Sequence, residues 1–559
     1  MGEFERQKGC EAVFDLLIKN GRIMDGTGNP WFYGDVAIKD NKIQKIGSID
    51  TSLASDIIDA KGLVVAPGFV EIHSHADFVL PLDEHPKILE PLVRQGVTTI
   101  VVGNCGYSPA PANSQTIELL KIYASFLQAK ELQWEWSDMK GYLDIIQKRG
   151  VAYNVVPLVS HGAIRIAVKG FKGGPATDPE KEEMAKLVEK AMEQGAFGVS
   201  CGLIYAPGMY SDTDELIAVS KPLKDFGGTF TAHVRGSSET LLPATREIIK
   251  VGEENRIAVE HSHFEAFGEE NWPKIDQALC LHDQARARGI DIAFDVIPYI
   301  AANTTLLAIF PPWSIEGGVS KLIERLKNKE VRKRINIDVE ETIPGWPPWL
   351  PGAWPHNLVR ATGWKNIVVI SVKSTANKHL EGESLTEIGR EKKKTPFDAA
   401  ADLIIEEQGQ VMALYIGVSG DMENEEWLRK IISHPRAAIC TDAIITGKGL
   451  PHPAAYGAFP KVLGYFSRDL KLFPMEEAVR KMTSMSLQRF GIRDRGLIRE
   501  GCFADITIFD EATVGEKGTY SDPAHFSEGI KHVIINGTPV LQNGRYNSKL
   551  CGHVLRKQK

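Results

Sequence analysis

Hydrophobic and polar positions follow a strand-like pattern at both ends of the chain. Over residues 14–58, short runs rich in branched side chains are separated by Gly and Asn turns, which predicts a small antiparallel sheet. The runs 505–509 and 532–536 return to the same pattern. Because strands occur at both ends, we expect residues 1–62 and 491–559 to form the two parts of one small β-sandwich domain.

The middle of the chain has a different pattern, in which apolar strand-like runs alternate with helical segments. In residues 180–194, Met184, Leu187 and Val188 recur at the spacing of three and four that marks one buried helix face. Such alternation is typical of parallel β/α units, and eight units predict a closed (β/α)8 TIM-like barrel over residues 63–490. The eight apolar runs end near His73, Gly103, His161, Ser200, His233, His261, Val296 and Asp442.

One insertion near residues 311–364 interrupts this alternation. A charged helix is predicted over 322–334, and a run rich in Pro and Trp follows at 344–355. Long loops inside compact domains are usually functional or disordered, and three Trp argue against disorder. The run therefore predicts either a lid or wall of a substrate site or an aromatic loop packed on the outside of the barrel.

Composition and charge exclude several classes of protein. The 65 Lys and Arg residues are outnumbered by 72 Asp and Glu residues, so no basic excess favours binding to nucleic acid. The apolar runs are too short to span a membrane, and Met1 to Glu5 do not begin a secretory signal. Seven scattered cysteines fit a reducing cytoplasm. We expect a cytoplasmic protein that binds a small molecule, with a homo-oligomer left open.

The strongest local motif is the run 67–75, a short apolar strand that ends in His73 and His75. Residues i and i+2 of an extended strand lie on one face, so both imidazoles can point at one metal ion. Surface histidines beyond a strand end would give the same pattern, and the motif needs support from elsewhere in the chain.

That support comes from the other strand ends. Further zinc-ligand types close apolar runs at Cys105, His233, His263 and Asp442. Taken singly, Cys105 is more often a small buried thiol. In a barrel, however, the carboxyl ends of all strands meet at one face, so these residues together predict a metal site. Thiolate, imidazole and carboxylate suit Zn²⁺, whereas Ca²⁺ and Mg²⁺ prefer oxygen ligands. His261 has the same parity as His263, so the pattern does not choose between them.

Several motifs resemble those of the amidohydrolase superfamily. They are the runs 25–28, 67–75, 96–99 and 501–505. A second set resembles the D-aminoacylase branch, the N-acyl-D-amino-acid deacylases. It comprises the runs 103–106, 161–165, 202–205, 262–263 and 451–453. The resemblance covers nearly the whole chain. Its Cys motif is specific, because most two-metal members of the superfamily bridge their metals with a carbamylated Lys and this branch uses a Cys.

The resemblance implies a zinc-dependent hydrolase that cleaves the C–N amide bond of an N-acyl-D-amino acid or a related N-acyl amine. It implies a tight zinc on Cys105, His233 and His263, and a second, weaker or empty site on His73, His75, Cys105 and Asp442. We expect Asp442 to be the catalytic residue, because a carboxylate beside the metal can act first as base and then as acid. Candidates for holding the substrate or the developing oxyanion are His161, Tyr205, Arg235 and Tyr299.

Three departures from the branch pattern lie where the substrate's carboxylate would be held. Glu265 stands in place of a Lys, Ala454 in place of an Arg, and the run 297–299 reads Ile-Pro-Tyr where Tyr-Pro-Tyr is usual. Loss of the Arg removes the strongest partner for a carboxylate. We therefore expect neutral analogues to be better substrates than free acids, unless Arg235 or Lys448 supplies the missing cation.

Two other functions remain open at this point. The same barrel and metal could open a cyclic amide, such as a hydantoin or dihydropyrimidine, or hydrolyse a lactone. A non-catalytic scaffold is the other alternative, since relatives of cyclic amidases exist that have lost their metal. The complete set of ligand-type residues argues against the scaffold.

Overall fold

The computed structural model of the protein describes residues 13–350 and 352–558. Met1 to Glu5, on which the expectation about a secretory signal rests, lie outside the described residues, as does Pro351 of the Trp-rich run. Across the two described ranges, no helix has both the length and the apolar content needed to cross a bilayer.

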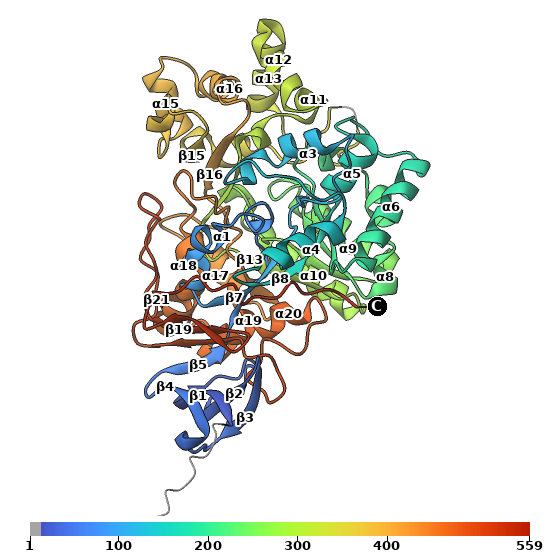
Figure 1. The fold of residues 1–559 in the computed structure, drawn as a ribbon. Coiled ribbons are helices and arrows are strands. Elements are labelled where there is room, and N and C mark those ends of the chain that lie inside the picture. The colour runs from blue at the N-terminus through green and yellow to red at the C-terminus, as the bar shows by residue number, and fades with distance from the viewer. Residues whose placement is uncertain (1–12, 351, 559) are drawn as a thin grey trace, which may run out of the picture.

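Strands from both ends of the chain share one nine-stranded sheet. Its order is β21-β20-β19-β18-β5-β1-β2-β3, and β4 pairs with β1. Antiparallel pairing of β18 with β5 joins the two ends, which lie side by side in Figure 1. The strands are β1 (Phe14–Ile23), β2 (Phe32–Lys39), β3 (Lys42–Gly47), β4 (Ala54–Asp59), β5 (Val64–Pro67), β18 (Ile506–Phe509), β19 (Ile530–Ile535), β20 (Thr538–Gln542) and β21 (Arg545–Tyr546).

The N-terminal strands form a mixed sheet, so the prediction of a purely antiparallel sheet over residues 14–58 is wrong. β1 pairs antiparallel with β2, but it pairs parallel with β4 and then with β5. At ten residues β1 is long enough to take both strands in succession along its other edge. The chain crosses over through β3 before it returns as β4, which is the connection that parallel pairing requires.

Parallel strands form two further sheets, in the orders β6-β7-β8 and β17-β13-β12-β11-β10-β9. Only Leu158 separates β8 from β9, so one interrupted strand belongs to both sheets. A strand is present at each of the eight predicted runs, and the α/β class is confirmed. The strands are β6 (Phe69–Glu71), β7 (Val97–Val102), β8 (Asn154–Pro157), β9 (Val159–Ser160), β10 (Gly198–Gly202), β11 (Thr229–His233), β12 (Ala258–His261), β13 (Ile292–Val296) and β17 (Ala437–Ile439).

Helices connect these strands. In α6 (Asp178–Glu193) the predicted apolar face is buried through Met184 and Val188, and a capping box between Thr177 and Glu180 begins the helix. The other helices outside the insertion are α1 (His85–Ile88), α2 (Glu90–Val93), α3 (Ile117–Tyr123), α4 (Met139–Arg149), α5 (His161–Lys169), α7 (Thr213–Ser220), α8 (Leu223–Phe226), α9 (Leu241–Asn255), α10 (Lys274–Ala287), α17 (Glu426–Ser433), α18 (Ala454–Lys461), α19 (Met475–Lys481) and α20 (Ser484–Gln488).

Between β13 and β17 the alternation is interrupted over a longer stretch than the predicted 311–364. Three antiparallel strands lie there in the order β14-β16-β15. Figure 1 shows them with α15 and α16 on the side of the molecule away from β1–β4. The elements are β14 (Ala301–Thr305), β15 (Ile367–Val372), β16 (Val411–Ile416), α11 (Pro312–Ile315), α12 (Val319–Lys327), α13 (Lys329–Glu341), α14 (Leu358–Thr362), α15 (Leu385–Glu391) and α16 (Pro396–Glu406).

The charged helix predicted over 322–334 is two helices, α12 and α13. They are separated at Asn328, whose side chain accepts hydrogen bonds from the backbone N–H groups of Glu330 and Val331. An Asn in this position satisfies the free N–H groups at a helix start, so it begins a new helix instead of continuing the first one.

Candidate metal centre

Two groups of buried ligand-type side chains share one residue, Cys105. All six residues that the sequence predicts as metal ligands belong to these groups, and within each group the ligand atoms lie within 4.8 Å of one another. The first group is His73, His75, Cys105 and Asp442, and the second is Cys105, His233 and His263. The structure therefore brings together the ends of five separate strands.

The Cys105 sulfur lies at the centre of this arrangement. Its Sγ is 3.1 Å from His73 Nε2, 3.6 Å from His233 Nδ1 and 3.5 Å from His263 Nε2. Asp442 lies on the side of the first group, where its Oδ1 is 3.0 Å from His75 Nε2. The same oxygen is 3.4 Å from His73 Nε2.

Three of the ligand-type residues have an unusual backbone conformation. The φ angles of Cys105, His263 and Asp442 are 50°, 34° and 47°, in the left-handed region that side chains other than Gly rarely adopt. Such conformations cost of order 1–3 kcal/mol each and cluster at functional sites. Each of these residues follows a strand, so the turn in the backbone directs the side chain toward the shared centre.

This turn separates His263 from His261, which the sequence pattern could not distinguish. His261 is the last residue of β12, and its Nδ1 lies 3.2 Å from Nε2 of His282 on α10. His263 lies beyond the strand, where alternation no longer applies, and it joins Cys105 in the second group. Two residues that are two positions apart have the same parity, so it is the turn at His263, with its positive φ, that gives the two side chains different surroundings.

Two buried carboxylates hold the histidines in place: Asp295, which the sequence analysis missed, and Glu265, which it considered only as a replaced substrate contact. Asp295 Oδ1 accepts a hydrogen bond of 2.7 Å from the backbone N–H of His263 and lies 3.3 Å from His73 Nδ1. Glu265 Oε1 lies 3.2 Å from His263 Nδ1. Partners of this kind fix the orientation of ligating imidazoles. Asp295 stands one residue before the predicted strand end at Val296. An acidic residue at the end of a strand was the feature of the sequence from which its place in the site could have been predicted.

The electrostatic environment favours anionic forms of Cys105 and Asp442. Burial by itself raises the pKa of the Cys105 thiol, but the neighbouring His73 and His263 outweigh it and hold this pKa well below its usual value. For Asp442 burial also raises the pKa, and His73 and His75 bring it below the ordinary value. A buried thiolate and carboxylate among imidazoles form a donor set that fits a divalent transition metal.

Of the four predicted substrate-binding residues, Tyr205 packs against the metal centre. Its ring lies 5.1 Å from that of His233, and its hydroxyl is 2.7 Å from Thr304 Oγ1. His161 is held instead by a buried carboxylate, with its Nε2 2.8 Å from Glu215 Oε1. Burial raises the pKa of Glu215, but His161 and Arg165 lower it to about 2.

Arg235 and Tyr299 are also engaged by carboxylates of the protein. Arg235 donates from Nε and Nη2 to the two carboxylate oxygens of Glu247, both at 3.0 Å. This bidentate pair neutralises the guanidinium, so Arg235 is not the free cation that the sequence analysis considered. The Tyr299 hydroxyl donates to Glu516, and Lys461 Nζ lies 4.1 Å from the Tyr299 ring centre.

Aromatic residues form the walls beside the metal centre. The ring of Tyr107, which the sequence analysis did not identify, lies 6.4 Å from His75 and 5.3 Å from Tyr205. Both tyrosines line an apolar cavity. A second cavity has Trp349 and Trp354 of the Trp-rich run among its lining residues, together with Arg235. The Trp-rich run therefore forms a wall of a cavity near the strand ends.

The sequence of the chain is similar to those of known hydrolases. The model of the amidohydrolase family matches residues 56–541. The chain is 31% identical to the D-aminoacylase of Alcaligenes xylosoxydans xylosoxydans, over 97% of this chain and 98% of that protein.

Two solved structures have a similar fold over nearly the full length. A D-aminoacylase structure, described by a binuclear metal centre with one-metal activation and second-metal attenuation, has a TM-score of 0.79 at 29% identity and covers 97% of this chain and 100% of its own. The N-acyl-D-glutamate deacylase of Bordetella bronchiseptica, in complex with zinc and a phosphonate mimic of the tetrahedral intermediate, also has a TM-score of 0.79, at 27% identity and with coverage of 97% and 99%.

Proposed function

The chain belongs to the amidohydrolase family, and we propose that it is a zinc-dependent deacylase of N-acyl-D-amino acids. It is a metal-dependent amidohydrolase that acts on a small-molecule substrate. The observation that carries the proposal is the position of Cys105, whose single sulfur belongs to both ligand groups. A Cys in this position is what the resemblance to the D-aminoacylase branch implies for a centre of two adjacent metal sites.

We further propose that the parallel strands close into a (β/α)8 barrel over residues 63–490, and that residues 1–62 and 491–559 form the small β-sandwich domain. A contact between the first and last strands supports closure. The Glu71 carboxylate accepts hydrogen bonds from the backbone N–H of His73 at 2.9 Å and of Thr441 at 2.8 Å. These two residues follow β6 and β17, so one carboxylate joins the ends of the strands that closure would place side by side.

The proposed metal is zinc, held tightly by Cys105, His233 and His263. A second, weaker site would use His73, His75, Cys105 and Asp442. Bound zinc supplies Lewis-acid chemistry, because it polarises the scissile carbonyl and makes a nearby water more acidic. The soft thiolate at the centre favours zinc over magnesium or calcium.

In this proposal Asp442 moves the proton. His75 holds its Oδ1, which leaves Oδ2 to take the proton from the attacking water. The water oxygen forms a bond to the acyl carbon, the C–N bond breaks, and Asp442 returns the proton to the leaving nitrogen. The products are a carboxylic acid and the amine of the amino acid, and the remaining proton of the water passes from the acid to the amine to give a carboxylate and an ammonium group. The lowered pKa of Asp442 keeps it ionised, and therefore able to act as a base, at neutral pH.

The apolar cavity beside the centre supports a substrate with an apolar group. Its lining includes Tyr107, Phe126, Phe171, Tyr205 and Leu307. An aliphatic side chain or acyl chain fits such a wall, because its burial removes apolar surface from water. The cyclic-amide and lactone alternatives are not favoured, since the full-length relatives described above are deacylases of acyl-amino acids.

Hydrolysis of matched compounds tests the proposed function. Purified protein loaded with zinc should release leucine from N-acetyl-D-leucine at least tenfold faster than from N-acetyl-L-leucine. Hydantoin should be opened more slowly than either. A chelator should abolish the activity and zinc should restore it. Faster opening of hydantoin, or full activity after complete removal of metal, would show that the assignment is wrong.

A further inference from the structure

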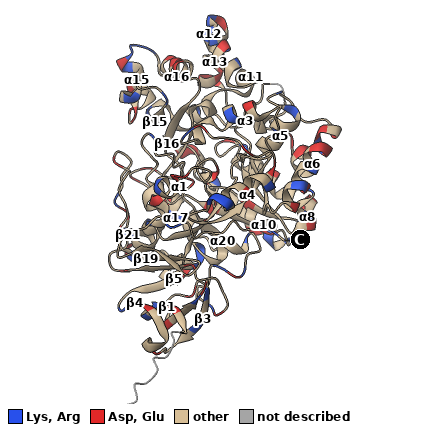
Figure 2. Cartoon of the chain, viewed as in Figure 1, with Lys and Arg blue, Asp and Glu red and all other residues tan. Residues whose placement is uncertain are grey.

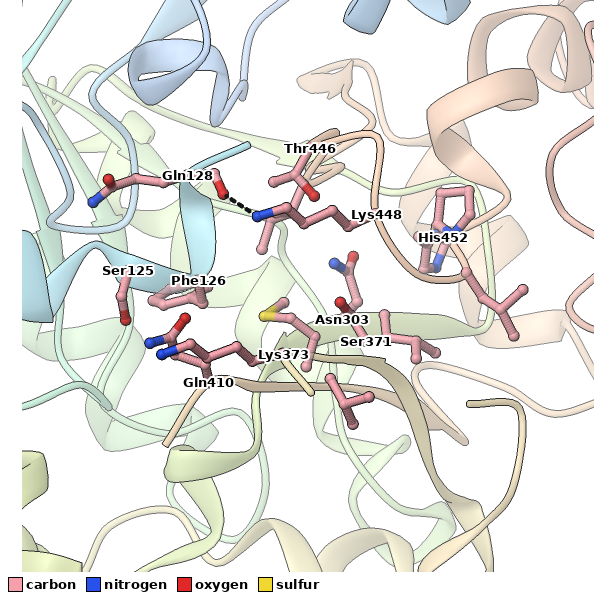
Figure 3. A pocket seen from close by; sticks show the side chains of 16 residues that line it. Ser125, Phe126, Gln128, Asn303, Ser371, Lys373, Gln410, Thr446, Lys448 and His452 are labelled. Carbon is pink, nitrogen blue, oxygen red and sulfur yellow. Dashed lines mark hydrogen bonds between the residues drawn. The ribbon is translucent and has the colours of Figure 1, made fainter. Parts of the chain in front are cut away.

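A polar cavity lies between the segment that follows Asp442 and the antiparallel sheet of β14, β15 and β16. Sixteen residues line it, and Figure 3 shows their side chains. None of them is Asp or Glu, while two are lysines. The side chains with hydrogen-bonding groups include Lys373, Lys448, Asn303, Gln128, Gln410 and Ser371. The cavity therefore has a positive charge and amide groups, and no carboxylate to compensate them.

The two lysines keep their charge available. Lys448 Nζ donates to the backbone carbonyl of Gln128 at 3.3 Å, which is a neutral partner. Within the described ranges 13–350 and 352–558, no carboxylate forms an ion pair with Lys448 or Lys373. Both residues are exposed, so a small anion can reach them from solvent.

Other cations near the strand ends are already neutralised. Arg235 is paired with Glu247 and Arg165 with Glu215. Lys461 Nζ lies 3.4 Å from a carboxylate oxygen of Glu516. A carboxylate that approaches any of these groups would compete with an existing anion, whereas the residues that line the polar cavity include no Asp or Glu.

Two of the residues that line the cavity connect it to the surroundings of the metal centre. Ile444, which lines it, lies two residues after Asp442. Phe126 lines both this cavity and the apolar one, and its ring is 5.2 Å from that of Tyr107, the neighbour of His75. A molecule that extends from the metal centre past Tyr107 and Phe126 would therefore approach this cavity.

We propose that Lys448 and Lys373 bind a carboxylate of the acyl-amino-acid substrate in this cavity, with Asn303 as a hydrogen-bonding partner. This inference rests on the proposed function. It explains how the chain can hold an acidic substrate although position 454 is a fully buried Ala and Glu265 is engaged by His263. Figure 3 shows the two lysines lining the cavity from two different segments. An ammonium and a carboxylate in this setting form a charge-assisted hydrogen bond.

Pairs of substrates that differ by a single carboxylate test the proposal. N-acetyl-D-leucine is compared with its amide, and N-acetyl-D-glutamate with N-acetyl-D-glutamine. In the pair whose members differ in the bound carboxylate, Lys448→Gln should raise KM at least tenfold for the member that has this carboxylate and less than twofold for the member that lacks it, with a smaller effect for Lys373→Gln. Lys448→Arg should restore KM to within about threefold. Lys365→Gln, at an exposed lysine of the same insertion outside the cavity, is the matched control and should leave KM unchanged.

The two pairs distinguish which carboxylate is bound. A selective loss in the leucine pair assigns the cavity to the carboxylate on the α-carbon, and a loss confined to the glutamate pair assigns it to an acidic side chain. Unchanged KM values for every free acid in the double variant Lys448→Gln/Lys373→Gln would overturn the inference and leave the deacylase activity standing. If the wild-type protein hydrolyses no member of either pair, the proposed function fails and the inference fails with it.

Discussion

At the scale of single residues, the metal centre depends most on Cys105. The five other ligand-type residues each belong to one group, whereas the sulfur of Cys105 belongs to both. The neighbouring imidazoles lower the pKa of its thiol despite full burial, so it is held as the thiolate that a metal requires. Its loss should therefore affect both sites at once.

We predict that Cys105→Ala removes the bound metal and with it the activity. Three protein ligands leave little coordination to spare in the second group. Metal content after dialysis should fall below about a tenth of the wild-type value, as measured by plasma mass spectrometry. Cys201→Ala is the control, because Cys201 is also buried, in strand β10, but belongs to neither group. If Cys105→Ala kept a full complement of zinc and normal turnover, the ligand assignment would be wrong.

A substitution of Asp442 should impair proton transfer but leave metal binding in the second group intact. Asn preserves the size of the side chain but cannot carry a proton, so Asp442→Asn should lower kcat by a factor of about 10² to 10⁴. Zinc in the second group, which does not include Asp442, should be retained. Steady-state kinetics together with metal analysis check both statements. Asp56→Asn, in strand β4 of the sheet built from the chain ends, should behave as wild type. Unchanged kcat in Asp442→Asn would exclude this residue from the reaction.

At the scale of elements, strand ends explain why the candidate site was predictable. Hydrophobic periodicity located the strands, and the ligand types Cys105, His263 and Asp442 follow two or three residues after the strand ends. Their positive φ angles were not predictable, because no local pattern marks a left-handed residue other than Gly or Asn. That is why the choice between His261 and His263 required the structure.

Partners distant in the sequence account for most of what the sequence analysis missed. Arg235 follows a ligand-type residue, which suggested contact with substrate, yet Glu247 on α9 neutralises it. The same reason applies to Tyr299, whose partner Glu516 lies 217 residues away. The insertion was underestimated because strands β14, β15 and β16 pair with one another outside the β/α alternation on which the prediction rested. Hydrophobic periodicity along the sequence indicates which positions are buried, but it does not indicate which side chains contact one another.

The contact between β10 and the loop that carries Cys105 should be sensitive to a single methyl group. A Cβ at Gly202, the last residue of β10, would lie 2.0 Å from the backbone oxygen of Cys105. Gly202→Ala must therefore displace this loop and should weaken metal binding by tenfold or more, as measured by competition with a chelator. Gly515→Ala is the control, since nothing lies within 4 Å of a Cβ there. Equal metal affinity in both variants would mean that the loop tolerates the shift.

At the scale of the whole molecule, charge is distributed in both signs. Figure 2 shows Lys and Arg interspersed with Asp and Glu over the chain. The formal net charge of −7 disfavours an approaching anion at long range. At physiological ionic strength this effect is screened beyond about 8 Å. Recognition of a carboxylate must therefore be local, and the cavity with Lys373 and Lys448 meets that requirement.

The C-terminal segment completes the pairing of β8 at the point where the two parallel sheets meet. The backbone N–H of Val155 donates to His553 O, and that of Leu555 donates to Val155 O, both at 2.8 Å. A further bond of 2.9 Å joins Gly552 N to Val151 O. The C-terminal segment therefore pairs with the start of β8 along the edge where the next parallel strand would otherwise pair.

Deletion of residues 549–559 should lower stability without changing the chemistry. It removes the backbone hydrogen bonds to β8, each worth about 0.5–1.5 kcal/mol, and exposes the edge of a buried strand. The midpoint of thermal unfolding, followed by circular dichroism, should therefore fall by at least about 3 °C. Well below that midpoint, zinc content and kcat/KM should match the full chain, because the tail contacts the start of β8 and the ligands follow strand ends. Arg556→Gln keeps the backbone bonds and should have a smaller effect. A deletion that lost zinc while still folded would instead connect the tail to the metal centre, and an unchanged midpoint would mean that the pairing contributes nothing to stability.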